Sequence, residues 1–246
     1  MTAPCLLSLR DVHTHIGQYH ILHGVSLNVL RGQVTVLLGR NGAGKTTTLR
    51  TVMGLWKTSA GEIQLQGQRV NAWSTPQIAA AGVAFVPENM GIFSDLTVEE
   101  NMVLAARQAR TAADFDERRL TWIFDLFPPL HTFWGHPAGK LSGGQKQMLS
   151  MARAMIEPRE LLLIDEPSKG LAPSIVQNLV RALQALKTQG ATVLLVEQNF
   201  HLARTVGDSV AVMDNGRVVH EGSMAALADD EPLQQQLLGL SLGAHQ

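Results

Sequence analysis

The sequence has 246 residues, of which 45% are hydrophobic and 17% are charged, and its formal net charge is −1. This length allows one large domain or two small ones, and the composition is that of a folded globular protein. Basic and acidic residues are interspersed, so the chain lacks the charged surface by which proteins bind nucleic acid, and its single cysteine, Cys5, excludes an internal disulfide.

The sequence shows no targeting or membrane segment. Its first ten residues contain neither a basic region nor an apolar run long enough for a signal peptide. No stretch approaches the ~18 apolar residues of a membrane span. We therefore expect a soluble, cytosolic chain, which another protein would have to hold at a membrane if it works there.

The N-terminal third alternates between apolar and polar residues in the manner of β-strands. We expect strands over residues 6–16, 21–30 and 34–38, and a short hairpin over residues 61–70.

A helical stretch follows, over residues 97–156. Thr97 and Glu100 form a capping box at its start. Good helix formers fill residues 105–127 and stop at a pair of prolines, and apolar residues recur at helical spacing over residues 143–156.

The remaining sequence alternates buried strands, at 161–165 and 192–197, with a helix over 173–188, and then turns a hairpin at Asn215-Gly216. This order of elements predicts an α/β fold, in which a parallel sheet carries an antiparallel β subdomain and a helical insertion.

We expect a single domain over residues 1–246. Residues 1–87 and 158–246 would form its α/β core with the antiparallel β subdomain, and residues 88–157 its helical subdomain.

Residues 39–46, GRNGAGKT, fit the pattern GxxxxGK[ST] between a predicted strand and a predicted helix, which is the context that this motif requires. Its glycines let backbone N–H groups turn toward phosphate oxygens, and the helix N-terminus adds the positive end of its dipole. We expect Lys45 to reach the β- and γ-phosphates of ATP, and the Thr46 hydroxyl to bind Mg²⁺. The predicted ATP-binding residues are Gly39, Arg40, Asn41, Gly42, Ala43, Gly44, Lys45, Thr46 and Thr47.

The buried strand 161–165 ends in two carboxylates, Asp165 and Glu166. The strand would deliver Asp165 to the Mg²⁺ side of the phosphates. Glu166, one residue later, is placed to polarise a water molecule for attack on the γ-phosphate.

A second glycine-rich motif, LSGGQ, comprises Leu141, Ser142, Gly143, Gly144 and Gln145. It opens a predicted helix and supplies a second set of N–H groups for an anion. A chain with both sites suggests a head-to-tail pair, in which the Ser142 segment of one copy closes the phosphate loop of the other. The alternative, that Ser142 only caps a helix, is disfavoured by its position about twenty residues before Asp165.

The order of these three motifs resembles the ATP-binding cassette (ABC) family over nearly the whole chain. A closer similarity is to the F-type ATP-binding subunit of importers for branched-chain and other hydrophobic amino acids. The segments that carry it are GRNGAGKTTTLRTVMGL (39–55), FVPENMGIFSDLTVEEN (85–101), DEPSKGLAP (165–173) and LVEQNF (195–200).

This resemblance implies the P-loop NTPase core of an ABC ATPase, which hydrolyses ATP with Mg²⁺. It also implies a dimer of such subunits, formed by this chain with itself or with a sister ATP-binding subunit. Two membrane permeases and a periplasmic solute-binding protein would complete the importer, and the chain would lie peripherally at the cytoplasmic face of the inner membrane.

Three positions depart from the usual pattern of the family. Glu88 stands where a glutamine usually contacts Mg²⁺, and a carboxylate can still ligate this ion. Ala172 replaces an aspartate, which removes a polar contact across the dimer. Ile16 falls at the position of the aromatic residue that stacks on adenine, and Tyr19, three residues on, either takes over this role or is a half-buried strand tyrosine.

A fourth departure is Gln198, where a histidine usually touches the γ-phosphate. A hydrogen bond to a charged group nets ~1.5–3 kcal/mol and a neutral one ~0.5–1.5 kcal/mol. Because Gln198 keeps an N–H donor, we expect slower turnover rather than none: a loss of ~1 kcal/mol in the transition state is about fivefold in rate. We therefore predict Glu166 and Gln198 as the catalytic residues. The alternative is that Gln198 is a polar cap on the following helix.

Met90, Ile92, Phe93 and Leu96 form a short apolar cluster before the helical stretch. In the family this segment meets the cytoplasmic coupling helix of the permease, so we interpret it as a docking surface. The alternative is an apolar loop that folds onto its own domain.

Other functions share much of this pattern. An amide or urea importer would use the same motor, because specificity for the solute lies in the binding protein and the permeases. A lipopolysaccharide-type export ATPase has the same motif order but would favour glutamine at position 88 and histidine at position 198. A nucleotide-binding regulatory subunit that does not hydrolyse ATP is disfavoured by the intact Glu166.

Overall fold

The computed structural model describes residues 4–239. The larger sheet consists of β3 (Val34–Leu38), β6 (Val83–Val86), β7 (Leu161–Asp165), β8 (Val193–Glu197), β9 (Ser209–Asp214) and β10 (Arg217–Ser223). The smaller sheet consists of β1 (Cys5–Ile16), β2 (Tyr19–Leu30), β4 (Thr58–Leu65) and β5 (Gln68–Arg69).

The helices are α1 (Lys45–Val52), α2 (Thr75–Ala80), α3 (Val98–Ala105), α4 (Glu117–Leu126), α5 (Pro128–Thr132), α6 (Gly143–Met155), α7 (Pro173–Thr188), α8 (Phe200–Val206), α9 (Met224–Asp229) and α10 (Glu231–Leu238). Short 3-10 turns lie at Ala112–Asp114 and Ala138–Lys140. Within residues 4–239, none of the helices is both long and apolar enough to cross a bilayer.

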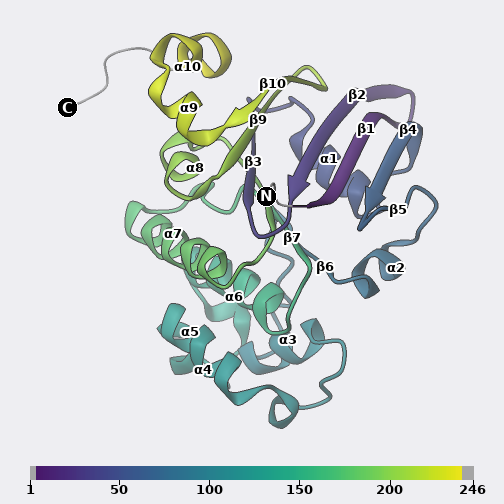
Figure 1. Ribbon diagram of the computed structural model, residues 1–246. Coiled ribbons are helices and arrows are strands. Elements are labelled where there is room, and N and C mark those ends of the chain that lie inside the picture. The colour runs from purple at the N-terminus through teal and green to yellow at the C-terminus, as the bar shows by residue number, and fades with distance from the viewer. Residues whose placement is uncertain (1–3, 240–246) are drawn as a thin grey trace.

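The predicted α/β fold is confirmed. The strand order of the larger sheet is β10-β9-β3-β8-β7-β6, with β10 antiparallel to its neighbour and the other strands parallel. The smaller sheet is antiparallel, in the order β2-β1-β4-β5. In Figure 1, α3, α4, α5 and α6 gather at one end of the molecule, away from the smaller sheet.

Both faces of the larger sheet are buried. Val34, Val36 and Leu38 of β3 face the core that also contains α6 and α7, whereas Leu37 faces the core beneath the smaller sheet. Parallel strands that are covered on both faces are apolar throughout. This is why β3, β7 and β8 are nearly continuous apolar runs, with Thr35 inside β3 and a carboxylate at the end of β7 and of β8.

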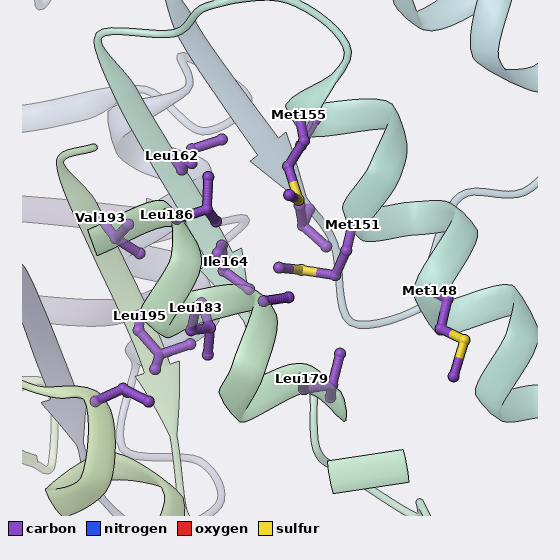
Figure 2. Close-up of a cluster of buried hydrophobic side chains, with 14 of the residues drawn as sticks. Met148, Met151, Met155, Leu162, Ile164, Leu179, Leu183, Leu186, Val193 and Leu195 are labelled. Atoms are coloured by element: carbon purple, nitrogen blue, oxygen red, sulfur yellow. The ribbon is translucent and has the colours of Figure 1, made fainter. Parts of the chain in front are cut away.

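Three methionines of α6 lie within the first of these cores (Figure 2). Met148, Met151 and Met155 are each at most 2% exposed, and Figure 2 shows Met151 pointing from α6 toward Ile164 of β7. Flexible thioether side chains fill irregular gaps between packed elements. The methionine stripe on this helix therefore serves the packing of the core.

The structure corrects one prediction, that helix runs through residues 105–127. Residues 106–116 lie outside both α3 and α4. There the Asp114 carboxylate accepts a hydrogen bond from the Thr111 N–H at 2.9 Å, so a side chain takes a donor that a continuous helix would need. Asp116 then caps α4, which begins at the next residue.

Candidate functional site

The carboxyl ends of β3, β7 and β8 meet at one edge of the larger sheet, and the loops that leave them carry most of the predicted site residues. The loop after β3 leads into α1 and contains the glycine-rich motif. Gly39 is required there, because a Cβ would lie 2.3 Å from the carbonyl oxygen of Met213. Gly44 has a φ of 105°, in the left-handed region that favours glycine, and directly precedes α1. The N-terminus of α1 therefore opens onto the loop with N–H groups free for an anion.

Lys45, the first residue of α1, is buried against this loop. Its Nζ donates to the carbonyl oxygens of Gly39 (2.9 Å) and Arg40 (3.0 Å). It also lies 3.0 Å from Oε1 of Glu166. A phosphate bound in the loop would therefore compete with Glu166 for the ammonium group of Lys45.

Thr46 and Asp165 are in direct contact, as the sequence predicts for a shared metal site. The Thr46 hydroxyl donates to Oδ1 of Asp165 at 3.0 Å, and the other oxygen, Oδ2, is buried without a partner. Burial raises the pKa of Asp165 to about 6, although the hydrogen bond from Thr46 opposes this rise. A cation beside this carboxylate would lower the pKa again.

These oxygens fit Mg²⁺. Mg²⁺ is usually held by one or two carboxylates together with water and phosphate oxygens, rather than by a full cage of side chains. In the part of the chain that the structure describes, no three His, Cys, Asp or Glu side chains are arranged around a common metal position. The Thr46 hydroxyl and the unpartnered Oδ2 of Asp165 would supply the protein ligands, and ATP and water the rest.

Glu166 lies at the sharp turn that follows β7. Its φ is 43°, a conformation that is costly for a residue with a side chain and is common at functional sites. Burial would raise the pKa of its carboxyl, but hydrogen bonds from Lys45 and Gln198, together with the charges of Lys45 and Lys169, hold it below its ordinary value. Glu166 is therefore ionised at neutral pH, which is the state needed to accept a proton.

Gln198 extends from the end of β8 to the same point. Its Nε2 donates to Oε2 of Glu166 at 2.7 Å and to Oδ1 of Asn41, in the phosphate loop, at 2.8 Å. The cap of α8 is a different residue, Asn199, whose side chain accepts from the N–H of Leu202. The helix-cap interpretation of Gln198 is therefore wrong, and the structure brings this side chain to both the loop and the carboxylate.

A cavity of about 350 Å³ lies over these groups. Its lining residues are Ile21, Asn41, Gly42, Gly44, Lys45, Thr46, Thr47, Glu88, Glu166 and Lys169. Two of these residues, Ile21 and Lys169, were not predicted. The signal for Lys169 was its position three residues after Glu166, and no pattern in the sequence pointed to Ile21.

Two predicted residues lie differently from the rest. The carboxylate of Glu88 lines the cavity, but it is paired with Nζ of Lys169 at 2.5 Å. Tyr19 is 67% exposed at the turn between β1 and β2 and is not among the lining residues. Ile21, two residues after it, lines the cavity instead.

The LSGGQ segment lies away from this cavity, which none of residues 141–145 lines. The Ser142 hydroxyl caps α6 by accepting from the N–H of Gln145 at 3.3 Å, and Oε1 of Gln145 accepts from the Ser142 N–H at 2.8 Å. Ser142 and Gly143 are both exposed. The same segment thus caps its helix and presents the helix N-terminus to solvent.

The apolar segment before α3 has one strongly exposed side chain, Phe93, at 50%. The buried side chain of Asn101 holds its backbone by accepting from the Phe93 N–H at 3.0 Å and donating to the Phe93 carbonyl at 2.9 Å. The guanidinium group of Arg153 lies 5.4 Å from the centre of the Phe93 ring. The ring is therefore presented to solvent on a fixed backbone.

Comparison with known proteins gives consistent matches. A family model described as "ABC transporter" matches residues 22–169, more than half of the chain. The high-affinity branched-chain amino acid transport ATP-binding protein BraG of Pseudomonas aeruginosa is 38% identical, over 95% of this chain and 100% of BraG. The probable branched-chain amino acid transport ATP-binding protein LivF of Archaeoglobus fulgidus is 32% identical, over 94% of this chain and 99% of LivF. A solved structure of an ATP-binding subunit of an ABC transporter matches with a TM-score of 0.80 at 30% identity, over 95% of this chain and 96% of that one.

Proposed function

The chain belongs to the ABC transporter family, as an ATP-binding subunit of the kind that hydrolyses ATP to drive transport, and from this premise we propose that it powers the uptake of branched-chain or other hydrophobic amino acids. The observation that carries the proposal is the similarity to BraG, a branched-chain amino acid transport protein, over the whole length of BraG. Because the similarity extends over the whole of BraG, this chain can serve as the ATP-hydrolysing subunit of the same class of importer.

In this proposal the phosphates of ATP lie on the loop formed by residues 39–47. The N–H groups of the loop and of the α1 N-terminus would hold the phosphate oxygens. Lys45 would exchange its contact with Glu166 for one with the β- and γ-phosphates, which leaves Glu166 free. Thr46 and Asp165 would hold Mg²⁺, which would neutralise charge on these oxygens, and Glu88 would join them once its carboxylate leaves Lys169.

Glu166 acts as the general base. Its carboxylate accepts a proton from the water whose oxygen attacks the γ-phosphorus, as the bond from that phosphorus to the bridging oxygen of ADP breaks. The Gln198 amide nitrogen lies 2.7 Å from Glu166 and orients its carboxylate with one N–H. Its other N–H, which donates to Asn41 in the nucleotide-free chain, would turn to the γ-phosphate. Loss of a general base costs ~10²–10⁴ in rate, whereas loss of the neutral donor costs about fivefold.

The catalytic site is completed by a second subunit. The exposed N-terminus of α6, at Ser142 and Gly143, is a donor surface that lies away from the cavity of its own chain. In a head-to-tail pair this segment would close the cavity of the partner over the γ-phosphate. The partner is a second copy of this chain or a sister ATP-binding subunit.

The exposed Phe93, with Met90, Ile92 and Leu96 around it, would dock the cytoplasmic coupling helix of a permease. An apolar side chain on a backbone held by Asn101 suits such a contact, because little order has to be gained on binding. Two permeases and a periplasmic solute-binding protein would complete the importer, with this chain at the cytoplasmic face of the inner membrane.

Uptake of labelled solutes tests the proposal, in cells that carry the chain, lack it, or carry Glu166→Gln. The panel would include leucine, isoleucine, valine and phenylalanine, with urea and a short amide as alternatives. We expect uptake of one or more hydrophobic amino acids with the intact chain, and background uptake in the other two strains. Uptake of urea or the amide alone would assign the motor to a different importer, and no difference for any solute would overturn the importer assignment.

A further inference from the structure

Glu197, the last residue of β8, is a buried carboxylate that the proposed mechanism does not use. Glu197 is only 2% exposed. Oε1 accepts a hydrogen bond from the N–H of Ser168 at 3.1 Å. Oε2 accepts from the Ser168 hydroxyl at 2.9 Å and from the N–H groups of Gln198 at 3.1 Å and Asn199 at 3.2 Å.

All four donors to this carboxylate are neutral. Among residues 4–239, no Lys, Arg or His side chain lies within ion-pair distance of Glu197. Burying an ionised carboxylate is costly unless its lone pairs are satisfied, and burial raises the pKa of Glu197 accordingly. A small apolar residue at this position would avoid that cost but would leave all four donors without this acceptor, so what the carboxylate supplies is a common acceptor for them.

The four donors come from two separate loops. Sheet pairing between β7 and β8 ends with the bond from the Glu166 N–H to the Val196 carbonyl, at 2.9 Å. Beyond this bond the two strands run into different loops, which contain Ser168 and Gln198. The Glu197 carboxylate joins them, because it takes hydrogen bonds from both.

We propose that Glu197 is a positioning residue for ATP hydrolysis, which sets the distance between Glu166 and Gln198 by holding the backbones of their two loops on one carboxylate. The Gln198 side chain reaches Glu166 at 2.7 Å from a backbone that Glu197 fixes at its own N–H. Ser168, two residues after Glu166, is fixed by the same group at both its N–H and its hydroxyl. This inference rests on the proposed function, because Glu166 and Gln198 are catalytic only within it.

The test is ATP hydrolysis by the purified full-length chain, assembled with its partner subunits, and by Glu197→Gln, Gln198→Ala and the double variant. Glu197→Gln replaces one acceptor oxygen by an N–H₂ group, which would face a donor and loosen one loop. We expect its kcat to fall to about that of Gln198→Ala, roughly fivefold below wild type, with a KM for ATP within about twofold of wild type. Because Glu197 acts through Gln198, the double variant is expected to be no slower than Gln198→Ala alone.

Three results would overturn the inference. They are an unchanged kcat in Glu197→Gln, a double variant slowed by the product of the two single effects, or a KM for ATP that rises by as large a factor as kcat falls. Glu221→Gln, at an exposed position on β10, is the control for the change from a carboxylate to an amide. It should leave kcat unchanged. If Glu197→Gln does not fold, Ser168→Ala removes one of the four donors, and its effect is expected to vanish in the same way when combined with Gln198→Ala.

A second measurement separates this inference from the proposed function. Solvent exchange of the Gln198 side-chain amide, followed by NMR in the chain without nucleotide, needs no turnover. We expect exchange to be about tenfold faster in Glu197→Gln than in wild type, as for the loss of one hydrogen bond. An unchanged exchange rate would overturn the positioning role. A wild type without turnover but with this change in exchange would contradict only the catalytic roles of Glu166 and Gln198.

Discussion

Asp165 places a carboxylate in the interior of the protein with only part of its hydrogen-bonding capacity satisfied. It is 1% exposed, Thr46 donates to one oxygen, and the other oxygen has no partner. Burial raises the pKa of Asp165 from 3.8 to about 6. A rise of this size means that the ionised carboxylate lowers the free energy of unfolding of the nucleotide-free chain by about 2–3 kcal/mol at neutral pH.

We predict that Asp165→Asn stabilises the nucleotide-free chain while it removes Mg²⁺-dependent hydrolysis. The amide keeps an acceptor for Thr46 and carries no charge, so the melting temperature at pH 7.5 should rise by ~4–10 °C. The folded state binds the extra proton between pH 3.8 and about 6. The advantage of the variant should therefore be largest above pH 6 and shrink as the pH falls toward 4.

Thermal unfolding at pH 7.5 and pH 4.5 measures this effect, with Asp95→Asn, at an exposed loop position, as the control. A variant that is less stable than wild type at pH 7.5 would mean that the Asp165 carboxylate stabilises the fold, contrary to the cost inferred from its burial.

The residues of the candidate site were only partly predictable from the sequence. The glycine-rich loop, Glu166 and Gln198 follow strand ends and Asp165 ends a strand, and the strand ends of a parallel sheet meet at one edge. Ile21 was missed because it lies where the pairing of β1 with β2 shifts register, between Thr14 and His15, and no alternation of apolar residues reveals such a shift.

Lys169 was missed for another reason. It follows the turn at Glu166, whose positive φ redirects the chain. The sequence does not show which way the loop leaves such a turn, and only the structure places Lys169 between Glu166 and Glu88.

At the scale of helices and strands, Glu157 joins the end of α6 to the segment after α3. Its Oε1 accepts from the N–H of Arg107 at 2.7 Å and its Oε2 lies 3.1 Å from a guanidinium nitrogen of Arg159. Burial would raise the pKa of Glu157, but the N–H groups of Arg107 and Gln108 and the charge of Arg159 hold it below its ordinary 4.5. The ionised carboxylate therefore stabilises the fold above that pH, and this contribution is lost as the pH falls through the folded-state pKa.

We predict that Glu157→Gln lowers the free energy of unfolding by about 2 kcal/mol at pH 7, since it leaves Arg159, only 7% exposed in its side chain, without a countercharge. Urea unfolding at pH 7 and pH 4 measures the change. The difference from wild type should be smaller at pH 4, because Glu157 of the unfolded chain takes up a proton below its ordinary 4.5, whereas the pKa in the folded chain is lower. Asp125→Asn, on the exposed side of α4, is the control, and an equal loss at both pH values would show that charge is not the cause.

The helices between residues 97 and 156 were the least predictable elements. The capping box at Thr97 is a local pattern, and its prediction is confirmed. Ser142 also forms a capping box, with Gln145, although we had disfavoured the interpretation that it only caps a helix. The break at residues 106–116 arises in part because Glu157, about fifty positions along the chain, takes the N–H groups of Arg107 and Gln108. Helix propensity depends on residues close in the sequence, so it does not reveal that a carboxylate about fifty positions away accepts these hydrogen bonds.

At the scale of the whole molecule, the proposed head-to-tail pair would join two groups of residues that lie on separate surfaces of one chain. Glu166 and Lys45 line the cavity and Gln198 contacts Glu166, whereas Ser142 is exposed and does not line the cavity. A single chain cannot bring its own Ser142 to its own phosphate loop without dismantling the core that holds α6. In the proposed pair, a second subunit would therefore close the site while ATP bridges the two subunits.

We predict that Glu166→Gln accumulates an ATP-bound dimer, because it binds ATP but lacks the base that hydrolysis requires. Light scattering should give twice the 26.7 kDa of one chain with Mg²⁺ and ATP, and a single chain with ADP. Adding Ser142→Arg should restore the monomer without loss of ATP binding, whereas Thr121→Arg, on exposed α4, should not. If the working partner is a sister subunit, the dimer will form only with that subunit and the Ser142 variant will still block it. Association with ATP that survives Ser142→Arg would mean that a different surface closes the cavity.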